Sequence, residues 1–117
     1  MSGRKNIIPI FQLLTNGDMS GAITTDPVKC ERIDNVNLEV VWSSGASLSG
    51  GGFDVQGSNT GNNWASLGLT ISGPTGASGV RNLDLNQVSH RFIRLVYTPP
   101  GGSPSGQLNV WASGKQV

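Results

Sequence analysis

Short apolar runs that end at glycine, proline, asparagine or serine recur along the whole sequence, and this pattern constrains the fold most strongly. The clearest run covers residues 36–42, where Val36, Leu38, Val40 and Trp42 alternate with mostly polar residues. Successive side chains of a β-strand point to opposite faces, so this run predicts a strand with one buried face. Several such strands separated by turn residues are typical of an all-β sandwich or barrel.

Further runs extend the pattern. The other predicted strands cover residues 53–57, 64–71, 80–85, 91–98 and 107–113. The run 91–98 is rich in aromatic and β-branched residues and ends at Pro99, which predicts a central strand. We expect residues 36–42 and 53–57 to form a hairpin, because a glycine-rich turn separates them.

The beginning of the sequence differs from these runs. Pro9 interrupts the apolar run 7–14, and proline cannot donate to a β-ladder, so this run is predicted to be an edge strand or an extended arm. Residues 1–6 are polar and basic, which predicts a flexible arm, with one domain over residues 7–117. The total of about eight antiparallel strands predicts a single-domain jelly-roll β-sandwich.

Composition excludes several classes of protein. The chain has 117 residues, enough for one core, and its 17 glycines are atypical of a helix bundle. Eight basic and seven acidic side chains give a net charge of +1, which argues against binding to nucleic acid or to an anionic membrane. The apolar run after Lys5 is too short for a secretion signal, so we expect synthesis in a reducing cytoplasm.

Few residues are suited to catalysis. His90 is the single histidine, and a metal site needs several converging ligands. Cys30 is either a reactive thiol beside Lys29 or, as we expect, a small half-buried residue. Asp18 and Asp26 suit a calcium site and turns equally well. We therefore expect that the protein is not an enzyme and that it binds no metal and no cofactor.

The tryptophans help to separate core from surface. Trp42 is in phase with the apolar face of its strand and is assigned to the core, whereas Trp111 is out of phase with Leu108 and Val110 and is placed on the opposite face. Exposed tryptophan is enriched at interfaces. Together with the arm and the first run, this predicts a partner interface made of Arg4, Lys5, Ile7, Ile8 and Trp111.

Two stretches of the sequence resemble the signatures of discoidin-type (coagulation factor 5/8 type C) β-sandwich domains. They comprise Phe53, Val55, Gln56, Ser58, Asn59, Gly61, Asn62, Trp64 and Leu67, and then Arg91, Phe92, Ile93, Arg94 and Leu95. The resemblance implies a β-sandwich in which Trp64 lies in the core. Such domains are usually longer and often contain a disulfide, which a single cysteine cannot form.

The whole chain also resembles small virion proteins of tailed bacteriophages. The matching stretches are residues 11–20, 85–87, 92–98, 106–110 and 113–115. This resemblance implies a structural part of the virion, a capsid decoration or a head or tail appendage, made in the host cytoplasm. We then expect a homo-oligomer that contacts other virion proteins and neither nucleic acid nor membrane.

A second hypothesis is a carbohydrate-binding module of discoidin-like type. It needs polar side chains at a loop tip, and Asn59, Asn62 and Asn63 qualify as the rim of a glycan site. The choice between the two hypotheses depends on resemblance, since a fold does not determine a function.

Overall fold

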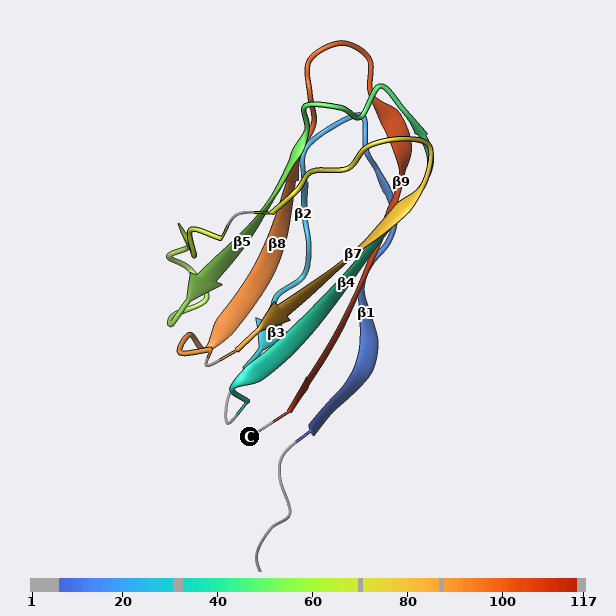
Figure 1. Ribbon diagram of the computed structural model, residues 1–117. Coiled ribbons are helices and arrows are strands. Elements are labelled where there is room, and N and C mark those ends of the chain that lie inside the picture. Colours follow the sequence, from blue (N-terminus) through green and yellow to red (C-terminus); the bar gives the residue numbers. More distant parts are fainter. Residues whose placement is uncertain (1–6, 31–32, 70, 87, 116–117) are drawn as a thin grey trace, which may run out of the picture.

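A computed structural model describes residues 7–30, 33–69, 71–86 and 88–115 as two antiparallel β-sheets packed face to face (Figure 1). The strands are β1 (Ile7–Asp18), β2 (Ile23–Thr24), β3 (Val28–Lys29), β4 (Asn35–Ala46), β5 (Gly52–Ser58), β6 (Ala65–Ser66), β7 (Gly79–Leu85), β8 (Phe92–Thr98) and β9 (Ser105–Lys115). Within these described ranges no helix is long and apolar enough to cross a membrane.

The strand order is that of a jelly roll. The first sheet, sheet A, has the order β1-β9-β4-β7. The second, sheet B, has the order β2-β8-β5-β6, and β3 also pairs with β8. Because β2 and β3 pair with different parts of the same neighbour, they act as one interrupted strand. The result is two four-stranded layers of an eight-stranded jelly roll, which confirms the predicted fold class.

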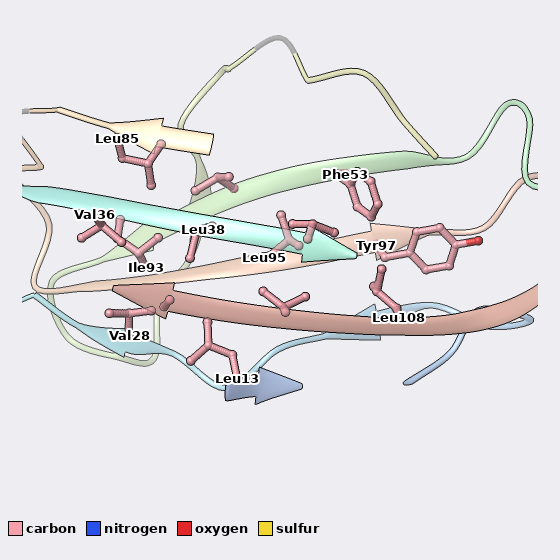
Figure 2. Packing of buried hydrophobic residues seen from close by; sticks show 14 of the residues in the cluster. Leu13, Val28, Val36, Leu38, Phe53, Leu85, Ile93, Leu95, Tyr97 and Leu108 are labelled. Carbon is pink, nitrogen blue, oxygen red and sulfur yellow. The ribbon is translucent and has the colours of Figure 1, made fainter. Parts of the chain in front are cut away.

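The core lies between the two inner faces. In β4 the inward side chains of Val36, Leu38, Val40 and Trp42 are each at most 2% exposed, as the alternation of the sequence predicts. Figure 2 shows side chains of both sheets interdigitating in this layer. The ring of Phe53 lies between two other aromatic rings and contacts Trp42 and Tyr97 at centroid distances of 6.2 and 5.8 Å.

Strand β1 is an edge of sheet A, as Pro9 predicts (Figure 1). It pairs with β9 along its length, but the register shifts three times, first between Ile8 and Phe11, where Pro9 interrupts the ladder. On the other sheet, β8 lies between β5 and the interrupted β2–β3 strand. The prediction of a central strand over residues 91–98 is therefore confirmed.

Two predictions about strand pairing are wrong. Strands β4 and β5 do not form a hairpin, because the chain crosses between the sheets there; β4 pairs with β7 and β9, and β5 pairs with β6 and β8. Among the described residues of the predicted strand 64–71, only Ala65–Ser66 is paired. Leu67 and Ile71 pack against the core as loop residues, which explains their apolar character without a longer strand.

Candidate functional site

The edge of sheet A carries exposed apolar side chains. Ile10 is 75% exposed and Phe11 is 37% exposed, both in the irregular first half of β1. Large apolar side chains gathered on an edge strand are suited to contact with another protein. We call Ile10 and Phe11 the β1 edge patch.

Trp111 lies on the outer face of sheet A, as its phase predicts. It is half-buried, and its cross-strand neighbours are Gln12 of β1 and Glu39 of β4. Beside it, the Asn109 side-chain oxygen accepts hydrogen bonds from the Gln12 side chain at 3.0 Å and from the Asn16 backbone at 2.9 Å. These bonds hold β1 on β9 despite its register shifts. Trp111 therefore lies on a largely polar face next to the β1 edge patch.

A groove of about 660 Å³ opens at the end of this sheet. It is lined by Pro9, Ile10, Asn35, Val36, Asn37, Asp84, Asn86, Ser113, Gly114 and Lys115. The Asp84 carboxylate accepts a hydrogen bond from the Asn37 side chain at 2.6 Å, which fixes its orientation. The groove combines an apolar wall with hydrogen-bonding groups, and it is continuous with the β1 edge patch through Ile10.

The other residues of the predicted interface are described only in part. Arg4 and Lys5, like the whole predicted arm 1–6, lie outside the described residues. The backbones of Ile7 and Ile8 begin β1 and pair with Lys115 and Gly114 of β9. The arm and its contacts therefore stay predictions.

The loop between β5 and β6 presents the three predicted rim residues. Asn59, Asn62 and Asn63 are exposed. Beneath them, the buried Ser58 hydroxyl accepts hydrogen bonds from the backbone of Thr60 at 3.2 Å and of Gly61 at 2.8 Å. These short-range bonds give the loop one fixed shape, so its rim is preformed.

The assignment of Trp64 to the core is wrong. Trp64 is half-buried on the outer side of sheet B, where its indole N–H donates to the Gly61 carbonyl oxygen at 3.2 Å. The guanidinium of Arg94 covers the ring at 4.1 Å from its centroid and donates from Nε to the Gln56 side chain at 2.8 Å. The inner positions of β5 and β8 are filled by other side chains, so Trp64 packs outside them.

The sequence did not indicate that Arg94 and Gln56 belong to this site. Both positions alternate with buried residues of their strands, Arg94 between Ile93 and Leu95, so an outward direction follows from the strand period. Which outward residues meet across β5 and β8 depends on the register, and the pairing of Gln56 with Arg94 comes only from the structure.

The residues suited to catalysis do not come together. Within the described ranges, no three His, Cys, Asp or Glu side chains lie close enough to hold a metal ion. The imidazole ring of His90 packs closely against the Cα atom of Gly57. Asp18 accepts a hydrogen bond from the Ser20 backbone at 2.9 Å, which lowers the pKa of its carboxyl and fits the turn interpretation.

Cys30 is more deeply buried than the half-buried position predicted for it. It is 4% exposed, and its thiol lies 3.6 Å from the Val28 carbonyl oxygen. Burial disfavours the thiolate and raises the pKa of Cys30 to about 11. At neutral pH the thiol is therefore protonated and a poor nucleophile.

Comparison of the chain with protein-family models gives no match, and comparison with curated proteins gives no significant similarity. The resemblances to phage virion proteins and to discoidin-type domains therefore stay predictions.

Proposed function

We propose that this protein is a structural component of a bacteriophage virion, a capsid decoration or an appendage protein, which assembles as a homo-oligomer through protein–protein contacts. The observation that carries this proposal is the β1 edge patch, in which Ile10 is 75% exposed on an open sheet edge. The resemblance of the whole chain to small virion proteins supports the same function.

The edge patch favours contacts made by side chains. Pro9 lacks a backbone donor and the ladder shifts beside it, so a continuous sheet across two copies is disfavoured at this end of β1. Complete burial of an exposed Ile or Phe side chain contributes about 1.5–3 kcal/mol to the free energy of association. A second copy that covers Ile10 and Phe11, with Trp111 at its margin, therefore gains most of its association energy from apolar contact.

The groove provides a place for the arm of a neighbouring copy. The groove holds one negative charge, that of Asp84, beside the positive charge of Lys115, and Arg4 and Lys5 of the arm can pair with Asp84. An extended, polar arm can bind such a groove by hydrogen bonds and charge while Ile10 covers its apolar atoms. Arms exchanged in this way would link subunits around a symmetry axis.

The contacts between this oligomer and the particle can each be weak. Many copies on a symmetric particle bind with avidity, because each contact holds the next copy near its own site. Catalysis has no part in the proposed function.

The experiment that tests the proposal is labelling of purified phage particles from cells that produce this chain, with gold-conjugated antibody raised against the protein. We expect regularly placed label on the head or the tail of intact particles. Absence of the protein from particles that are complete and infectious would reject the virion function.

A further inference from the structure

Two arginine side chains of this protein cover tryptophan rings. Arg81 lies over Trp42 at 5.2 Å, and Arg94 lies over Trp64 at 4.1 Å from the ring centroid. Stacking of this kind holds a guanidinium in one plane and lowers the entropy that it loses on binding a ligand. The two stacks differ in what the guanidinium donors do.

Arg81 is a structural residue whose donors are occupied. Its Nε donates to the Ser72 carbonyl oxygen, its Nη1 to that of Val80 and its Nη2 to that of Gly73, each at 3.3 Å. These bonds fix the segment between β6 and β7 over the edge of sheet A. Each of the three guanidinium nitrogens therefore already donates to a backbone carbonyl oxygen.

Arg94 is held by its stack on Trp64 and by one side-chain hydrogen bond, and its two terminal nitrogens are open. Its Nε donates to the Gln56 side chain at 2.8 Å. Among the residues that the structure describes, none accepts a hydrogen bond from either Nη atom of Arg94. Arg94 is half-buried on the outer face of sheet B, so both Nη groups form a preoriented fork. A planar fork of this kind matches a carboxylate, which it binds through two parallel hydrogen bonds.

The loop beside the fork adds neutral hydrogen-bonding groups. The Gly61 carbonyl binds the Trp64 indole N–H, so the loop is fixed to the same ring that Arg94 covers. The Thr60 hydroxyl accepts hydrogen bonds from the backbones of Asn62 and Asn63 at 3.1 and 3.2 Å. Their side-chain amides make no hydrogen bond within the described part of the chain and are exposed.

We propose that Arg94, supported by Trp64 and Gln56 and flanked by Asn62 and Asn63, forms a binding site for a carboxylate-bearing saccharide of the uronate class. The guanidinium fork binds the sugar carboxylate. The amides, which both donate and accept, bind ring hydroxyls, which do the same. This combination favours an acidic sugar, which carries hydroxyls around its carboxylate, over an acidic side chain, which offers acceptors alone. The site lies on sheet B and does not depend on the proposed assembly through sheet A.

The three indole N–H groups make a direct test by two-dimensional nitrogen–proton NMR of isotope-labelled protein. The additions are methyl β-D-glucuronide, methyl β-D-glucoside and acetate. We expect the glucuronide to shift the signals of Trp64 and of the Asn62 and Asn63 side chains, with those of Trp42 and Trp111 unchanged. The neutral glucoside lacks the carboxylate, and its affinity should be lower by a factor of roughly ten or more.

Variants assign the two halves of the site. Arg94→Lys keeps the charge but loses the fork, and should weaken glucuronide binding roughly tenfold, whereas the matched Arg81→Lys should leave it unchanged. Gln56→Glu is isosteric and places a competing carboxylate beside Arg94, so it should abolish binding in a folded protein even if Arg94→Lys does not fold. Replacing Asn62 and Asn63 by alanine should weaken the glucuronide and not acetate.

Three results would overturn the proposal. The first is an unchanged Trp64 signal at saturating glucuronide, and the second is equal binding of glucuronide and glucoside. The third is equal binding of acetate and glucuronide. It would show that Arg94 recognises any carboxylate, such as an acidic side chain of a protein, and does not recognise the sugar.

Discussion

The Tyr97 hydroxyl donates a hydrogen bond to the Met19 carbonyl oxygen at 3.0 Å, across 78 residues of sequence. Both residues are at most 1% exposed. Met19 follows β1 of sheet A, and its backbone N–H binds the Gly106 carbonyl oxygen at 3.1 Å. Tyr97 belongs to β8 of sheet B, and Figure 2 shows its ring in the layer between the sheets. This hydrogen bond therefore links the two sheets at one end of the core.

Removing this hydroxyl should destabilise the protein. Tyr97→Phe retains the ring contact with Phe53 but leaves the buried Met19 carbonyl oxygen without its partner. We expect the free energy of unfolding to fall by about 1–3 kcal/mol. Urea denaturation followed by tryptophan fluorescence measures it. The control is Thr98→Ala, an exposed neighbour on the same strand. Equal stability of Tyr97→Phe and the natural protein would show that the bond contributes nothing.

The close contact between Trp42 and Gly79 leads to a second prediction about stability. A Cβ at Gly79 would lie 2.3 Å from Cζ2 of the Trp42 ring, and that ring is held by the bond from its N–H to the Thr75 carbonyl oxygen at 3.1 Å. We expect Gly79→Ala to lower the free energy of unfolding by about 1–3 kcal/mol through overpacking.

The matched control for this change is Gly21→Ala, where a Cβ meets nothing within 4 Å. It should change stability by less than about 0.5 kcal/mol. Thermal unfolding of both variants gives the comparison, and similar midpoints for the two would contradict the tight fit at Gly79.

Cys30 predicts a loss of stability at alkaline pH. Burial raises the pKa of its thiol to about 11, whereas the pKa of the unfolded thiol is about 8.5. Its contribution to stability is therefore fully present below the unfolded pKa and is lost as the pH rises toward 11. Burial raises the pKa of Tyr97 as well, and this acts in the same direction at higher pH. The free energy of unfolding between pH 8 and 11 should fall more steeply in the natural protein than in Cys30→Ala; parallel curves would refute this.

Strand periodicity predicted much of the fold. The alternation in β4 and β9 predicted the inner faces, and Pro9 predicted the edge. The two-residue strands β2 and β3 were missed because so short a segment has no period to detect. The partners of β4 and β5 were missed because a glycine-rich turn serves a hairpin and a crossing between sheets equally well.

The candidate sites were predictable to different degrees. The outward direction of Trp111 and the exposure of Asn62 follow from phase and polarity alone. The contact of Arg94 with Trp64 does not, since it depends on a loop that folds back over the outer face of β8. Local sequence determines where a side chain points, and tertiary packing determines which side chains it meets.

The predicted arm gives a test of the assembly model. Deleting residues 1–6 removes Arg4 and Lys5 and no described core residue, so the fold should stay intact while assembly weakens. Circular dichroism checks the fold, and the dissociation of oligomers on dilution checks assembly. Asp84→Asn, which removes the negative charge of the groove and leaves that of Lys115, should weaken assembly in the same direction. Unchanged assembly in both variants would remove the arm from the account.

The most direct test of the central claim, assembly through the β1 edge patch, is the mass of the protein in solution by light scattering across a range of concentrations. We expect a fixed multiple of the 12.2 kDa chain that corresponds to a trimer or a larger closed oligomer. We also expect dissociation when Ile10 and Phe11 are both replaced by serine, but not for Leu69→Ser, a control that is 44% exposed outside the patch. A strict monomer at every concentration, or an oligomer that the double variant leaves intact, would contradict this claim.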